Sequence, residues 1–181
     1  MYQIKSLLKS SVLAGAICFA AASAMAQSTG KPTDPQIGDI VYTAGQADIG
    51  TAILALKKTE NKAVESFAED MIRDHLAVNK KLMALLHKLQ ITPEASDTSK
   101  TMYRNASVKQ EELWKLSGAA FDKAYAENEV AYHEAVNGAL ESTLIPSAQD
   151  GELKSLLETD LKLFREHQKH AEHLVSELKS S

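Results

Sequence analysis

The sequence predicts an all-α protein, a four-helix bundle made of two helical hairpins joined by a long connection. Four segments repeat apolar residues at helical spacing, and no segment alternates with period two for long enough to form a strand. The polar intervals between the four segments run short, long, short. Short intervals join antiparallel neighbours, so the first two segments and the last two are each expected to pair as a hairpin.

Helix-capping and helix-breaking residues mark the ends of the first two segments. Asp34 and Pro35 predict the start of a helix over 34–58, with Asp34 as its N-cap and Pro35 in its first turn. After a short polar turn, a second apolar stripe predicts a helix over 61–90, and Pro93 follows it.

The third segment is harder to delimit because a long polar stretch precedes it. Residues 91–106 are polar and aperiodic, which predicts a loop. Ser107 opens a capping-box pattern that predicts the start of the third helix, and Pro146 is expected to stop it. Within this helix, Ser117-Gly118 is a candidate kink.

The long interval leaves two topologies open. A fourth helix follows, capped by Ser147 or Asp150. Sixteen extended residues reach at most about 50 Å, and a helix of thirty residues is about 45 Å long. The connection could therefore run the length of the bundle, as in ferritin-like folds, while a simple up-down-up-down bundle is the alternative.

The N-terminus has the three parts of a secretory signal peptide, predicted over residues 1–26. Lys5 and Lys9 precede an apolar run, and residues 24–26 (Ala-Met-Ala) form a small-x-small cleavage site. Cleavage there makes Gln27 the first residue of the mature chain. We therefore expect an exported protein, periplasmic or secreted.

The mature chain is expected to have a short flexible leader over 27–33 and one bundle domain over 34–181. The signal peptide carries two lysines and no acid, so its removal changes the formal net charge from −4 to −6. This acidity argues against nucleic acid as a partner, because phosphate binding needs a basic surface. The only cysteine, Cys18, lies in the signal peptide, which excludes thiol chemistry in the mature chain. No mature segment is apolar over enough residues to span a membrane.

Polar residues on a helix's apolar stripe are informative, because that face is normally buried. Measured from the predicted helix ends, these positions fall near mid-bundle, within about two turns of a common layer. Imidazole and carboxylate groups suit Zn, Fe or Mn, and facing helices of a bundle are where such sites are built. The ionisable residues on the four stripes are the candidate metal ligands: Asp48, His75, Glu129, His133, Asp160 and His167.

A structural role is the alternative for each of these residues. A single buried histidine is often a hydrogen-bonded core residue, and the Glu-x-x-His spacing of di-iron bundles is absent here, since Glu129 and His133 are four apart. The histidines of 166–173 sweep around their helix, which favours a solvated face. The sequence lacks a nucleophile elbow and a glycine-rich phosphate loop, so it assigns no enzyme activity.

Three stretches carry a resemblance to a known family: FAEDMIRDHLAVNKKLMALLHKL (67–89), SGAAFDKAYAENEVAYHEAV (117–136) and FREHQKHAEHL (164–174). They resemble the bacterial domain of unknown function numbered 4142, which is assigned to the ferritin-like superfamily. The resemblance covers roughly residues 34–178. It implies a ferritin-like bundle, and His75, His133 and His167 coincide with the family's motif histidines.

These observations favour an exported helical bundle with a metal-binding or stress-related role. The alternative is a non-catalytic structural or protein-binding module that holds no metal. If the three histidines bind metal, their rings are expected to converge on one point beside a carboxylate. Each ring is then also expected to direct its second nitrogen at a carboxylate or carbonyl oxygen.

Overall fold

The computed structural model describes residues 30–180, and every secondary-structure element in that range is helical. This confirms the all-α prediction. The predicted signal peptide and its cleavage site lie outside the described residues. The elements in chain order are α1 (Asp34–Lys58), α2 (Lys62–Lys88), α3 (Asp97–Trp114), α4 (Gly118–Ala139), the π-helix η2 (Leu140–Leu144), α5 (Ile145–Ser147) and α6 (Gly151–Ser180).

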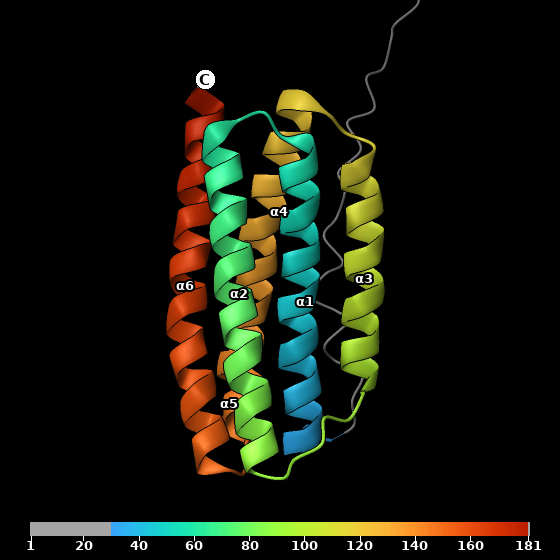
Figure 1. Cartoon of the computed structure of the whole chain (residues 1–181), viewed down its shortest axis with the longest axis vertical. Helices are drawn as coiled ribbons and strands as arrows, with labels where there is room; N and C mark the ends of the chain where they lie inside the picture. The colour runs from blue at the N-terminus through green and yellow to red at the C-terminus, as the bar shows by residue number, and fades with distance from the viewer. Residues whose placement is uncertain (1–29, 181) are drawn as a thin grey trace, which may run out of the picture.

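Four long helices, α1, α2, α4 and α6, enclose the core, and α3 lies outside them against α1 and α4 (Figure 1). The helix pairs α1–α2 and α4–α6 are the two hairpins. The chain leaves α2 at one end of the bundle and enters α4 at the other, and α3 covers the distance between them (Figure 1). The connection between the hairpins thus runs the length of the bundle. Assignment to the ferritin-like superfamily stays a prediction.

The prediction of a loop over 91–106 is wrong, because α3 begins at Asp97. Its N-cap is Ser96, whose hydroxyl accepts a hydrogen bond from the backbone N–H of Ser99, while the Ser99 hydroxyl accepts from the N–H of Ser96. Of the residues in α3, only Ser99 and Leu113 are buried. A helix that packs so lightly on the outside of a bundle has no apolar stripe for the periodicity to reveal.

The third predicted helix is divided at the candidate kink. The helix stops at Trp114 and restarts at Gly118, whose φ of 54° lies in the left-handed region that glycine adopts without strain. Downstream the chain stays helical through η2 and α5, so that Pro146 lies within the last helical turn, which ends at Ser147. The predicted end at Pro146 is therefore correct to one residue.

The observed caps refine the predicted helix starts. The first helix spans 34–58 as predicted, but its N-cap is Thr33, which forms a capping box with Gln36. The Asp34 carboxylate instead accepts hydrogen bonds from the backbone N–H groups of Gln149 and Asp150, at 2.8 and 2.9 Å. Asp150 caps the first turn of α6, which confirms one of the two predicted caps.

The apolar core is divided into two clusters by a polar layer. One cluster includes Ile37 and Leu86, and the other includes Phe67 and Leu174. On each of the four core helices, the residues between the two clusters include a buried ionisable side chain. This division places a layer of ionisable groups at mid-bundle.

In the described range, no helix is both long and apolar enough to cross a membrane. This agrees with the expectation from the sequence.

Candidate metal centre

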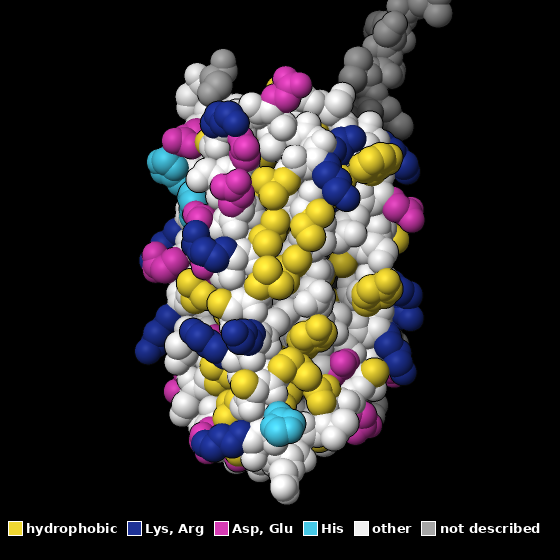
Figure 2. All heavy atoms as spheres, in the orientation of Figure 1, with side chains coloured by type: hydrophobic (Ala, Val, Ile, Leu, Met, Phe, Trp, Pro, Cys, Tyr) yellow, Lys and Arg dark blue, Asp and Glu magenta, His cyan; other side chains and the backbone are white. Residues whose placement is uncertain are grey.

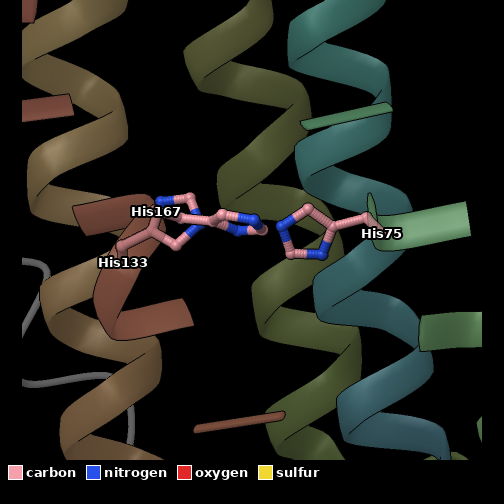
Figure 3. Close-up of side chains that lie close together, drawn as sticks. All are labelled: His75, His133 and His167. Carbon is pink, nitrogen blue, oxygen red and sulfur yellow. The ribbon is translucent and has the colours of Figure 1, made fainter. Parts of the chain in front are cut away.

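Three histidine rings from three helices meet in the polar layer. His75 comes from α2, His133 from α4 and His167 from α6, and their rings point toward one another (Figure 3). The ring centroids are 5.8 Å apart for His75 and His133, 5.3 Å for His75 and His167, and 5.4 Å for His133 and His167. One ring nitrogen of each histidine lies within 4.8 Å of the other two. All three side chains are buried.

Two of the rings are held by hydrogen bonds at one nitrogen only. Nδ1 of His133 donates to the backbone carbonyl of Glu129 at 3.0 Å, and Nε2 of His167 lies 3.1 Å from a carboxylate oxygen of Asp74. The other nitrogens, Nε2 of His133 and Nδ1 of His167, have no hydrogen-bond partner. His75 has no hydrogen-bond partner at either nitrogen. The expected support of the second nitrogen is therefore present for His133 and His167 and absent for His75.

Two carboxyl groups lie beside the imidazoles. Asp48, from α1, has Oδ2 at 3.5 Å from Nε2 of His75 and 3.6 Å from Nε2 of His133. Glu129, one turn before His133 on α4, has Oε2 at 3.8 Å from the other nitrogen of that ring. Asp48, Glu129 and His133 form a second group whose ligand atoms lie within 4.8 Å of one another. Each core helix thus contributes at least one side chain to this layer.

Burial sets the protonation of the imidazoles. It lowers the pKa of His75 to about 4, although the charge of Asp74 opposes the shift. It also lowers the pKa of His133 to about 4, against the attraction of Asp48. For His167, burial and then the neighbouring His75 lower the pKa. Neutral imidazole is the form that binds metal, so these rings have a lone pair available at neutral pH.

Burial acts on the carboxyl groups in the opposite direction. It raises the pKa of Asp48, although the imidazoles of His133 and His167 oppose the shift. It raises the pKa of Glu129 well above its ordinary value, and the nearby Asp48 adds to this. No lysine or arginine forms an ion pair with either group among the described residues. A cation placed between them would remove this penalty, since an opposite charge favours the ionised form.

The donor set fits a transition-metal ion. Three imidazole nitrogens and one carboxylate oxygen are the ligands that Zn²⁺ takes in tetrahedral sites, with nitrogen–metal distances of about 2.0–2.1 Å. Such bond lengths put neighbouring ligand atoms about 3.3 Å apart. One nitrogen from each of the three rings lies within 4.8 Å of the other two, and Oδ2 of Asp48 is 3.5 and 3.6 Å from Nε2 of His75 and His133. Closing the site around an ion therefore requires side-chain movements of about 1 Å.

The family resemblance seen in the sequence motifs extends over most of the chain. The family model described as domain of unknown function DUF4142 matches residues 19–174. The chain belongs to the DUF4142 family. Searches of curated proteins and of solved structures found no match to the chain.

The sixth sequence-predicted ligand of this DUF4142 protein, Asp160, lies apart from the others. It is buried on α6, seven residues before His167, which is about 10 Å along the helix axis. Its neighbours on the helix, Leu157 and Leu161, belong to one of the two apolar clusters. Asp160 is in neither of the two ligand groups found among the described residues.

Sequence reasoning missed two polar residues of α2 that flank His75 in the chain. Asp74, which holds His167, comes from α2, and the two partners are 93 positions apart in the chain. Asn79, one turn beyond His75, is buried with no partner for its amide, and it lies against Gly45, where a Cβ would approach its Oδ1 to 2.5 Å. The adjacency of Asp74 to His75 in the family-like motif was the available signal for the first. Nothing in the sequence indicated the second.

Replacement of His75 tests whether the polar layer stabilises the metal-free protein. An unsatisfied buried polar group costs about 1–3 kcal/mol, and both ring nitrogens of His75 are unsatisfied. We expect His75→Leu, of similar volume, to raise the free energy of unfolding of the metal-free protein by about 1–3 kcal/mol. The measurement is urea denaturation. His167→Leu is the matched control, because it breaks the contact with Asp74 and is expected to give no such gain. A loss of stability in His75→Leu contradicts the expectation.

Proposed function

We propose that this DUF4142 protein is an exported metal-binding protein that holds one ion of Zn, Fe or Mn at mid-bundle. His75, His133 and His167 are the nitrogen ligands, and Asp48 is the first carboxylate ligand. Glu129 lies beside them as a further carboxylate. The observation that carries the proposal is the convergence of three neutral, buried imidazoles whose facing nitrogens have no partner.

The energetics of the layer support this proposal over a purely structural one. Buried polar groups in proteins are normally hydrogen-bonded, because an unpartnered one loses its hydration without compensation. Here Nε2 of His133, Nδ1 of His167 and both nitrogens of His75 have no partner. No N–H group donates to Asp48, whose carboxyl group is paired with that of Glu129. One metal ion would bind one nitrogen of each ring and an oxygen of Asp48 at once. The contacts of His133 with a carbonyl and of His167 with a carboxylate are those that orient imidazoles toward a metal.

The proposal includes export, which rests on the signal-peptide pattern of residues 1–26. A periplasmic location would place the bundle where metal enters from outside the cell.

Metal stoichiometry is the experiment that tests the proposed function. The protein is prepared without an affinity tag and dialysed against Zn²⁺, Fe²⁺ or Mn²⁺, and bound metal is measured by mass spectrometry. We expect about one tightly bound ion per chain. The variant with Gln at His75, His133 and His167 is expected to bind none. The matched control carries Gln at the three other histidines, His87, His170 and His173, and is expected to bind as the parent does.

A second candidate function is supported by the surface. Hydrophobic side chains gather along α1 and α2 on the face shown in Figure 2, and large exposed apolar residues on these helices are Tyr42, Ile53, Leu56, Leu76 and Met83. Exposed apolar patches often mark protein interaction sites. This favours a protein-binding module, which would need no metal. Absence of bound metal in all three dialysis experiments selects this alternative.

A further inference from the structure

The side chains of the proposed metal centre differ in how close they lie to the surface. Four of the five are at most 3% exposed, namely Asp48, His75, Glu129 and His133. The side chain of His167 is 6% exposed, and it contacts the carboxylate of Asp74, which is 24% exposed. A buried metal site needs an entry path for its ion. The contact between His167 and Asp74 is the shallowest part of this enclosure.

Two other directions toward the centre are less suited to a cation. Along the bundle axis, one apolar cluster lies on each side of the polar layer. Toward α3, a cavity of about 190 Å³ has walls that include Met102, Ala106 and Val136. At its inner side, the Tyr132 hydroxyl ties α4 to α1 by donating to the carbonyl of Ala44 at 2.8 Å. A cation in an apolar passage loses its hydration without compensation.

The carboxylate of Asp74 joins the surface to the polar layer through its two oxygens. Oδ1 accepts a hydrogen bond from Nε of Arg73 at 2.9 Å, and Oδ2 lies 3.1 Å from Nε2 of His167. The other nitrogen of that ring, Nδ1, is buried and has no hydrogen-bond partner. The ring itself lies against those of His75 and His133, with centroids 5.3 and 5.4 Å away. One imidazole thus contacts both a partly exposed carboxylate and the buried histidines.

Arg73 covers this carboxylate from the solvent side. Its guanidinium donates to Asp74 through Nε and to Asp70 through Nη1, and its side chain is 65% exposed. Ion pairs as exposed as these contribute only about 0–1 kcal/mol, so the guanidinium can leave Asp74 at little cost. Its departure uncovers two carboxylates that lie one turn apart on α2, Asp70 and Asp74.

We infer that Asp74 is the entry ligand of the metal centre, which captures the ion at the surface and passes it to His167 when Arg73 moves away. As a step in metal uptake, this inference rests on the proposed function. Carboxylate and imidazole are both zinc ligands, so the ion has a ligand at each stage of the path. Negative charge at an entrance raises the local concentration of cations, and the positive charge of Arg73 lowers it.

Two variants change this entrance in opposite directions. Asp74→Asn keeps the shape and an oxygen for His167 but removes the charge, and it is expected to slow zinc binding to the metal-free protein about tenfold. Arg73→Gln removes the covering cation and is expected to speed zinc binding about threefold or more. Zinc uptake is followed after rapid mixing with a fluorescent zinc indicator. The matched controls are Glu69→Gln and Arg165→Gln, at exposed positions of α2 and α6, and are expected to bind zinc at the parent rate.

A residue that only orients His167 predicts a different pair of rates. Loss of such a residue weakens metal affinity about 10–100-fold, and the loss is expected as faster release. An entry ligand lies on the path in both directions. Asp74→Asn is therefore expected to slow release as well as uptake, with little change in the dissociation constant. Release into excess chelator is followed by mass spectrometry of the protein-bound zinc.

The outcomes separate this inference from the proposed function. Parent-like uptake in both variants, or faster release from Asp74→Asn, overturns the entry ligand, whereas one zinc ion per chain in the parent leaves the proposed function in place. A parent protein that binds no zinc overturns both. Arg73 is exposed, so its variant decides the matter if Asp74→Asn does not fold. Uptake by Arg73→Gln that is no faster than in the parent then overturns the entry ligand.

Discussion

Zinc at a free concentration 100 times its dissociation constant is expected to raise the melting temperature of the metal-free protein by about 5–11 °C. An ion that binds only the folded state adds about 2.7 kcal/mol at this concentration. For a domain of this size, 1 kcal/mol corresponds to about 2–4 °C. The measurement is a thermal unfolding scan with and without zinc, in buffer that sets the free metal concentration.

The two histidine variants provide the control for this shift. Replacement of the interior histidines His75, His133 and His167 by Gln is expected to abolish the zinc-dependent rise. Replacement of His87, His170 and His173 is expected to preserve it, even though His170 packs against Phe67 with ring centroids 5.0 Å apart and its loss lowers the starting temperature. A zinc-dependent rise that persists in the interior variant would place the bound ion elsewhere.

The helices that could be predicted from the sequence are those that bury a full stripe. In α1, buried residues recur along the whole helix, and the predicted bounds 34–58 are the observed ones. In α3, only Ser99 and Leu113 are buried, so the apolar period is missing and the segment reads as a loop. Apolar periodicity in a sequence reflects which residues are buried. A helix that contacts its neighbours along a narrow edge buries few residues, so its sequence shows little periodicity.

Most of the polar layer could also be predicted from the sequence. Stripe position and depth along the helix identified the five residues that the structure brings together: Asp48, His75, Glu129, His133 and His167. The depth of each residue along the bundle was measured from predicted helix ends. It therefore defines the layer only to within about two turns. Asp160, two turns from His167 on the same stripe, falls within that error. Contacts between helices, such as that of His167 with Asp74, depend on helix rotation, which one sequence does not determine.

The last prediction concerns the effect of Asp160 on the pH dependence of stability. Burial raises the pKa of Asp160 to about 7, although Lys81 opposes the shift, whereas an unfolded chain has an Asp pKa of about 3.9. Between these values the folded state binds the proton and the unfolded state does not. The stability from this group is therefore complete below about pH 4 and is lost as pH rises toward about 7, by about 1.4 kcal/mol per pH unit.

Asp160→Asn removes this titration while retaining nearly the same shape. Relative to the parent, the variant is expected to gain about 3 kcal/mol in free energy of unfolding between pH 5 and pH 8. Urea denaturation of metal-free protein across that range measures it. The buried histidines titrate alike in both proteins and cancel. Glu158→Gln, at an exposed position of α6, is expected to show no such trend. Because Asp160 lies outside both ligand groups, its replacement is also expected to leave zinc stoichiometry unchanged, and a loss of bound zinc would return Asp160 to the metal centre.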